Sequence, residues 1–327
     1  MVSRHEDKER MASVSTTTPF FSIIIGVYDD WMPLDQCLRS LEQQTNGPSF
    51  EVIVVDDGSR DVAPEYIRNW TCVYPLTLVR QPHAGVSAAR NRGIQISKGL
   101  VLVFVDADCR FQPDCLAALG ATITQSRQHN CFQLHLVGDY SEIAGRAEEL
   151  RLITLQSQLL QPDGCIRYLN TAGFAIRRAR VNIKGGLFDP VAVRAEDTLL
   201  LANLIKGGEL PLFVPNATVQ HAIPLSLLEC FRKDIEVAHL DARTYDIIAA
   251  KGVRFRVGQQ ERMRMLLSMW KTSGQDSIRR SAWFVLAARQ APRSIILFLR
   301  KVAPWGFKRM SRLDRTQSEI HDKSSSS

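Results

Sequence analysis

Three short runs of apolar, mostly β-branched residues constrain the fold of this 327-residue chain more than any other feature. Each run is continuous rather than alternating, as expected of strands that are buried on both faces of a parallel sheet. The runs are residues 20–27, 51–55 and 100–105. Helical periodicity separates them, first behind Pro33 and again at Val86–Ile96. This alternation predicts an α/β domain with a mostly parallel sheet flanked by helices.

Acidic residues follow each of these runs. They are Asp29 and Asp30, Asp56 and Asp57, and Asp106 and Asp108. Because ligands bind beyond the carboxyl ends of parallel strands, we predict a polar site at that edge of the sheet. Two carboxylates two residues apart at a strand end suit a hard cation such as Mg²⁺ or Mn²⁺, although Asp is also common in turns. We therefore predict that Asp106-Ala107-Asp108 binds a metal.

Four motifs in the first third of the chain resemble those of family 2 glycosyltransferases in both order and spacing. They are Ser22–Tyr28, Val54–Ser59, Gly85–Gly93 and Phe104–Asp108. The resemblance continues through Gly185–Asp189 and Arg194–Asp197 to His221, so it covers roughly residues 20 to 240. It implies a GT-A fold, a nucleotide-sugar donor, a divalent cation (Mn²⁺ or Mg²⁺) and inversion at the anomeric carbon.

The resemblance also implies which residues bind the donor. Tyr28 would contact the base, and Asp57, next to Asp56, would accept a hydrogen bond from the base edge. A carboxylate in that place reads the N3–H of uracil, which favours a UDP-sugar. The alternative for Asp56-Asp57 is an ordinary turn. Arg90 would lie near the donor, although it could equally be a solvated helix residue.

The same resemblance assigns the metal ligands. Asp108 would hold the cation, while Asp106 would either help or contact the ribose or sugar of the donor. His221 matches a histidine of the family that touches the metal or the diphosphate, but a lone histidine is more often merely structural.

Glu196 and Asp197 supply the candidate base. An inverting transfer needs one carboxylate that takes the proton of the acceptor hydroxyl as it attacks the sugar. Asp197, with Glu196 beside it, matches the family's Glu-Asp motif. The alternative is a helix cap, because both residues precede the helix predicted at Thr198–Lys206.

Charge and composition predict the domain organisation. We expect disordered tails at 1–18 and 316–327, a GT-A catalytic domain at 19–222 and a helical basic region at 223–315. Between Lys251 and Arg315 the chain has 16 Lys and Arg against three acids, a net charge of +13, whereas the remainder carries −6. Basic residues and aromatics such as Trp283 and Trp305 together favour contact with an anionic membrane surface. The alternative is a solvated or packed helical surface, and no motif indicates nucleic-acid binding.

The sequence therefore predicts an inverting glycosyltransferase of the hexosyltransferase type, whose acceptor is a lipid-linked glycan or polysaccharide precursor. No apolar secretory segment is visible, and Ala282–Leu299 is interrupted by charges, so we expect a cytoplasmic protein, peripheral at the inner face of the membrane. Two alternatives are a catalytically silent subunit that binds carbohydrate or nucleotide-sugar, and a sugar-nucleotide nucleotidyltransferase. The second would need a glycine-rich phosphate loop after the first strand, where the chain has Gly26–Asp30.

Overall fold

The computed structural model describes six segments of the chain, which fall into two compact units. The segments are residues 18–138, 143–192, 194–222, 227–250, 259–274 and 280–289. Unit 1 comprises the described residues up to His135 with Asn170–Phe188 and Pro211–Val219, and unit 2 comprises Leu136–Leu169, Asp189–Leu210 and those from Gln220 on. The predicted tails, apart from Thr18, lie outside the described residues. The units do not follow the predicted boundary at residue 222, which stays a prediction.

Eight strands form one mixed sheet in the order β3-β2-β1-β4-β7-β6-β8-β5. Their bounds are β1 Phe21–Val27, β2 Phe50–Asp56, β3 Leu76–Arg80, β4 Val101–Asp106, β5 Cys109–Phe111, β6 Cys131–Gly138, β7 Phe174–Arg177 and β8 Leu212–His221. The first four strands pair in parallel, whereas β7 pairs antiparallel with β4 and β6. The predicted α/β fold is therefore confirmed, and its parallel half is the half that the apolar runs predicted.

The helices follow the predicted periodicity closely in unit 1. Their bounds are α2 Trp31–Glu42, α3 Glu65–Arg68, α4 Val86–Ile96, α5 Cys115–Gln125, α6 Ile143–Leu159, α7 Glu196–Lys206, α8 Leu227–Ala250 and α9 Gln259–Ser273, and residues 280–289 are also helical. The helix predicted at residues 86–96 has those bounds, and the helix predicted to begin at Thr198 begins two residues earlier, at Glu196.

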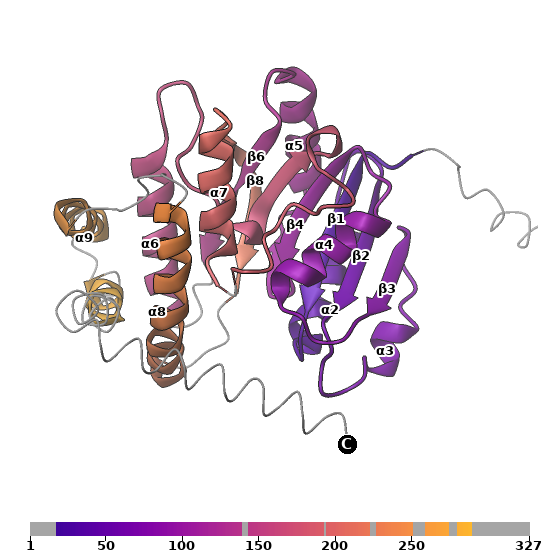
Figure 1. Cartoon of the computed structure of the whole chain (residues 1–327), viewed down its shortest axis with the longest axis horizontal. Coiled ribbons are helices and arrows are strands. Elements are labelled where there is room, and N and C mark those ends of the chain that lie inside the picture. The colour runs from indigo at the N-terminus through magenta and orange to yellow at the C-terminus, as the bar shows by residue number, and fades with distance from the viewer. Residues whose placement is uncertain are drawn as a thin grey trace, which may run out of the picture. The chain divides into compact units, whose positions relative to one another are not determined.

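Helices cover both faces of the parallel strands in unit 1 (Figure 1). Gly93 of α4 lies directly against Ile24 of β1, with no room for a side chain between them. On the other face, Gly120 of α5 lies close to the ring of Phe21. Because residues 21 and 24 point to opposite sides of a strand, β1 is buried on both faces, as its continuous apolar run requires.

The ends of the parallel strands coincide at one edge of the sheet. In the strand pairing, Val27 lies opposite Asp56, and Gly26 lies opposite Asp106. The prediction that the acidic strand ends share one edge is therefore confirmed by the register.

Unit 2 is mainly helical. Helix α8 packs on α7 through Ile248 against Leu199 and Ala202, and it also lies beside α6 (Figure 1). On α6, Ala147 and Leu150 share an apolar cluster with residues of α9 and of the helical segment 280–289. None of the helices that the structure describes is long and apolar enough to cross a membrane.

Candidate active site

Arg90 and Asp106 form an ion pair at the acidic edge of unit 1. The Nη2 atom of Arg90 donates to Oδ1 of Asp106 at 2.7 Å, and the guanidinium lies 5.4 Å from the centre of the Phe188 ring. The Arg90 side chain is only 2% exposed, whereas that of Asp106 is 38% exposed. The interpretation of Arg90 as a solvated helix residue is therefore wrong. Arg90 fixes one oxygen of Asp106, the last residue of β4.

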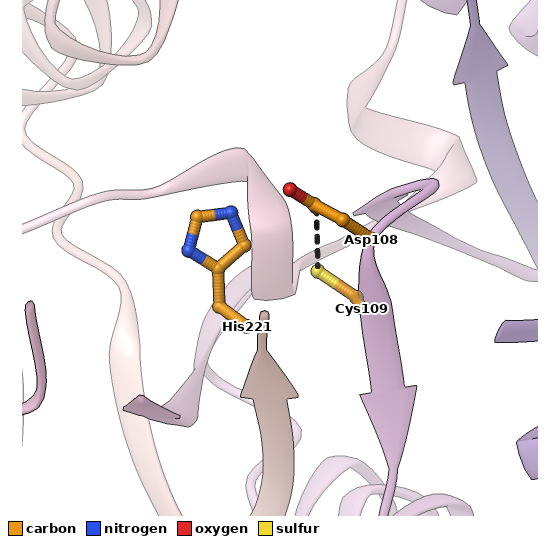
Figure 2. Close-up of side chains that lie close together, drawn as sticks. All are labelled: Asp108, Cys109 and His221. Atoms are coloured by element: carbon orange, nitrogen blue, oxygen red, sulfur yellow. Dashed lines mark hydrogen bonds between the residues drawn. The ribbon is translucent and has the colours of Figure 1, made fainter. Parts of the chain in front are cut away.

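Asp108 lies two residues further on, in the turn between β4 and β5. The buried Cys109 Sγ is 3.9 Å from Oδ1 of Asp108 (Figure 2). It is also 3.5 Å from the carbonyl oxygen of Ala172, and both distances are within hydrogen-bonding range of a thiol. Burial, and then the charges of Asp108 and Asp106, raise the pKa of the Cys109 thiol well above its usual value. Cys109 is therefore a neutral donor at neutral pH.

The two half-buried carboxylates of this turn fit a divalent cation of the Mg²⁺ or Mn²⁺ kind. Both ions prefer carboxylate oxygens, and both usually keep positions for substrate phosphates. Arg90 holds one oxygen of Asp106, and one oxygen of Asp108 lies within range of the Cys109 thiol.

Asp57 is buried at 4% exposure and holds the loop between β3 and α4. Its Oδ1 accepts from Gln81 Nε2 at 2.7 Å and from the backbone amide of Ala84 at 3.0 Å. Its Oδ2 accepts from the amide of Gly85 at 2.8 Å and pairs with His83 Nδ1 at 3.0 Å. A carboxylate has about four acceptor positions, so a base N–H would have to replace one of these partners.

Asp56 makes the turn that was the alternative for the Asp56-Asp57 pair. Its Oδ1 accepts from the backbone amide of Ser59 at 2.8 Å, and Arg80 lies 3.5 Å from its Oδ2. Ser59 Oγ in turn accepts from the amide of Asp29, whose carboxylate is paired with Arg60. These bonds tie together the loops that follow β1 and β2.

His83 is a residue of this edge that the sequence reasoning missed. Its ring lies 4.6 Å from that of Tyr28, and its Nδ1 also lies 3.0 Å from the carbonyl oxygen of Asp57. The side chain is 60% exposed, and Tyr28 is 41% exposed. Two exposed rings beside a buried carboxylate can stack on a planar base. The only signal in the sequence was the position of His83 just before the Gly85 motif.

Asn91 explains why two distant motifs belong together. Its Oδ1 accepts from the amides of Leu187 and Phe188, and its Nδ2 donates to the carbonyl of Phe188 at 2.8 Å. Gly186 adopts a φ of 77°, and a Cβ there would lie 2.6 Å from Cγ of Asn91. A side chain at residue 186 is therefore excluded both by the backbone and by Asn91.

An ion pair on α6 interacts electrostatically with candidate residues of unit 2. Both guanidinium nitrogens Nε and Nη2 of Arg151 donate to the carboxylate of Glu148, the former at 2.7 Å. Burial alone would raise the pKa of Glu148, but Arg151, His221 and Arg289 outweigh it and lower this pKa to about 2. His221, the last residue of β8, is therefore coupled to this pair.

Asp197 is coupled to the same ion pair and is not the cap of its helix. The N-cap of α7 is Ala195, in a left-handed conformation at φ 54°, and it makes no side-chain cap. Oδ1 of Asp197 accepts from the amide of Thr198 at 2.6 Å and lies 3.2 Å from its hydroxyl. The pKa of Arg151 is raised, against the effect of burial, by Glu148 first and also by Tyr168 and Asp197.

The predicted site residues thus fall into two groups. Unit 1 holds Tyr28, Asp56, Asp57, Arg90, Asp106 and Asp108, and unit 2 holds Glu196, Asp197 and His221. The register and the Arg90 ion pair bring the first group together, and the Glu148–Arg151 pair links Asp197 with His221. The role of each residue stays a prediction.

The family model of glycosyl transferase family 2 matches residues 22–186, about half of the chain. The chain belongs to this family. The resemblance to family 2 glycosyltransferases that the four motifs indicated is therefore confirmed.

Curated relatives match over about a third of the chain's length. Glycosyltransferase AglE of Haloferax volcanii is 39% identical over 99 residues, which are 29% of this chain and 33% of AglE. The uncharacterized glycosyltransferase YibD of Escherichia coli is 38% identical over 98 residues, 30% of this chain and 28% of YibD. The matched segments thus span a third or less of these relatives.

Solved structures match far more of the chain at lower identity. The mannosyltransferase PcManGT of Pyrobaculum calidifontis, solved with GDP-Man and Mn²⁺, is 18% identical with a TM-score of 0.55, covering 91% of this chain and 84% of its own. TarS of S. aureus is 16% identical with a TM-score of 0.51, covering 84% and 53%. These similarities confirm the GT-A fold.

Proposed function

We propose that this protein is an inverting glycosyltransferase that moves a sugar from a UDP-sugar to an acceptor hydroxyl in the presence of Mn²⁺ or Mg²⁺. The observation that carries the proposal is the set of acidic strand ends in unit 1, organised around the Arg90–Asp106 ion pair. The acceptor in this proposal is a lipid-linked glycan or polysaccharide precursor, which the enzyme meets at the inner face of the membrane.

The donor binds to unit 1 in this proposal. Its base stacks on the exposed ring of Tyr28, and its N3–H takes the place of His83 on Oδ2 of Asp57. The His83 side chain is 60% exposed and can turn toward solvent, so this exchange costs less than the loss of a backbone amide. A mannosyltransferase of this fold, PcManGT, was solved in complex with the nucleotide-sugar GDP-Man and Mn²⁺, which supports a nucleotide-sugar donor.

Asp108 and Asp106 hold the divalent cation in this proposal, with His221 as a further ligand. When bound, the cation supplies charge that neutralises the leaving diphosphate. Arg90 orients Asp106 through their 2.7 Å hydrogen bond. The Cys109 thiol lies within hydrogen-bonding range of Oδ1 of Asp108. His221 ends β8, a strand whose residues up to Val219 belong to the unit that contains Asp108.

Asp197 acts as the general base. Its carboxylate takes the proton of the acceptor hydroxyl, the acceptor oxygen forms a bond to C1 of the sugar, and the bond from C1 to the diphosphate oxygen breaks. UDP leaves with the electron pair of that bond, and the attack from the opposite face inverts the anomeric carbon. The positive charge of the half-buried Arg151, whose pKa Asp197 helps to raise, favours the ionised form of the Asp197 carboxylate, the form that a base requires.

The test is turnover of a panel of UDP-sugars, followed by mass spectrometry with Mn²⁺ present. The wild type is expected to cleave at least one donor, and Asp197→Asn is expected to lower this rate by roughly 10²- to 10⁴-fold. Asn keeps an oxygen that accepts from Thr198, so the change removes the charge and spares the local hydrogen bonds. Glu196→Gln is the matched control and should lose less. A panel that is neither bound nor cleaved would sink the proposal.

A further inference from the structure

The helical segment 280–289 and α9 have one buried and one exposed face. On α9, Met269 and Ser273 are buried, and on the segment 280–289 so are Ala282 and Leu286. The three apolar residues of this set join the cluster with Ala147 and Leu150 of α6. The two helices are therefore anchored to α6 within unit 2, with their other residues exposed.

Large apolar side chains gather on the exposed face. Leu267 is 54%, Trp270 38% and Phe284 60% exposed. The rings of Trp270 and Phe284 lie 6.0 Å apart although they belong to different helices. A soluble surface scatters such residues singly, so a contiguous aromatic group indicates an interaction site.

Three basic side chains surround these apolar residues. Arg264 and Lys271 are exposed on α9 at positions one turn away from Leu267, on the same side of the helix. The guanidinium of Arg280 lies 5.5 Å from the centre of the Trp270 ring and donates from Nε to the carbonyl of Gly274 at 3.0 Å. Every charged side chain whose exposure the structure describes on this face is basic.

Trp283, which the sequence suggested as a membrane anchor, has a different place. Its Nε1 donates to the carbonyl of Leu266 at 2.8 Å, and its ring packs 4.9 Å from that of Trp270. This half-buried residue joins the two helices, so Trp270 and Phe284 are the aromatic residues available to contact a partner surface. The predicted anchors beyond residue 289 lie outside the described residues.

We propose that Arg264, Leu267, Trp270, Lys271, Arg280 and Phe284 form a patch, here named the α9 patch, that binds the surface of an anionic bilayer. Aromatic rings settle at the level of the lipid headgroups, while Lys and Arg are attracted by anionic lipids, each by about 1 kcal/mol near the surface. The α9 patch presents both kinds of side chain on one face. This proposal rests on the proposed function, because a lipid-linked acceptor would give the enzyme a reason to bind such a surface.

The test is co-sedimentation of the full chain with vesicles of neutral phosphatidylcholine alone or mixed with anionic phosphatidylglycerol. The wild type is expected to bind the anionic vesicles, and to bind less as salt is raised. Trp270→Ser/Phe284→Ser and, separately, Lys271→Gln/Arg280→Gln are each expected to weaken binding by about tenfold or more. The matched control is Tyr66→Ser/Arg68→Gln in α3, an exposed aromatic and an exposed cation of unit 1, which should bind as the wild type does.

Three results would overturn the proposal. The first is equal binding of the wild type and both patch variants, and the second is equal binding of neutral and anionic vesicles. The third is a fall in the oligomer mass of the patch variants without a change in vesicle binding, which would assign the patch to a second copy of the chain. The charge variant keeps the test valid if the aromatic variant misfolds. UDP binding without vesicles should be the same in all variants, so a failed proposed function is distinguished from a failed membrane surface.

Discussion

Unit 1 and unit 2 hold their charged groups in different ways. In unit 1 the carboxylates follow adjacent parallel strands, and backbone amides of nearby loops hold Asp57 while Arg90 holds Asp106. In unit 2 the centre is an ion pair between Glu148 and Arg151 within one helix. The first arrangement is set by sheet topology, whereas the second depends on which helix residues are packed inward.

The largest expected effect concerns the ion pair of unit 2. Glu148→Gln leaves Arg151 without its carboxylate, and we expect the free energy of unfolding to fall by about 3 kcal/mol at neutral pH. The pKa of Glu148 is lowered in the folded state from 4.5 to about 2, so its contribution is complete above about pH 4.5 and is lost as the pH falls toward 2. Denaturant titrations of both proteins across this pH range measure the difference.

The control for this prediction is the neighbouring residue. Glu149 is as buried as Glu148, at 6% exposure, but accepts from the backbone amide of Gly138. Glu149→Gln keeps an acceptor oxygen and should cost only about 1 kcal/mol. If both variants lose the same stability and the loss does not shrink in acid, the ion pair is not the centre of unit 2.

The corresponding change in unit 1 is Arg90→Met. We expect a loss of about 2 kcal/mol in the free energy of unfolding, less than at Glu148, because Asp106 is partly exposed and water can replace the guanidinium. Arg92→Met, two residues further along α4 and exposed, should change stability by less than about 0.5 kcal/mol. Equal effects at residues 90 and 92 would show that the pair with Asp106 contributes no stability.

The smallest effect separates a motif glycine of unit 1 from a turn glycine of unit 2. Gly186 and Gly208 have φ angles of 77° and 76°, but a Cβ meets Asn91 at Gly186 and has nothing within 4 Å at Gly208. Because both Ala variants share the backbone strain, Gly186→Ala should cost about 1 kcal/mol more than Gly208→Ala. Thermal or chemical unfolding of the two variants measures this difference. An equal loss of stability at both positions would mean that Asn91 can move away from a Cβ at residue 186 without destabilising the fold.

Much of unit 1 could be predicted from the sequence, because continuous apolar runs and acidic strand ends report directly on a parallel sheet. The register that sets Val27 opposite Asp56 follows from that topology. The partners of Asp57 were not predictable, since Gln81, Ala84 and Gly85 reach it only through the shape of one loop. Arg90 was left open for a similar reason, as the burial of one helix side chain depends on the sheet beneath it.

Unit 2 was less predictable. Glu148 and Arg151 lie three residues apart on a helix, a spacing that is common on solvated surfaces, and nothing local shows that Glu148 is buried at 6% exposure. Glu196-Asp197 was found through the family motif, and the sequence left a helix cap as the alternative. The structure places Ala195 at the N-cap, while Asp197 accepts from the first-turn amide of Thr198.

The central claim is that donor and metal bind through Asp108 while Asp197 acts only in the transfer. The most direct measurement is calorimetric titration of UDP, with and without Mn²⁺, into wild type, Asp108→Asn and Asp197→Asn. We predict that Mn²⁺ strengthens UDP binding in the wild type and in Asp197→Asn, and that Asp108→Asn loses this effect. Mn²⁺-dependent binding that survives in Asp108→Asn, or is lost in Asp197→Asn, would contradict the account.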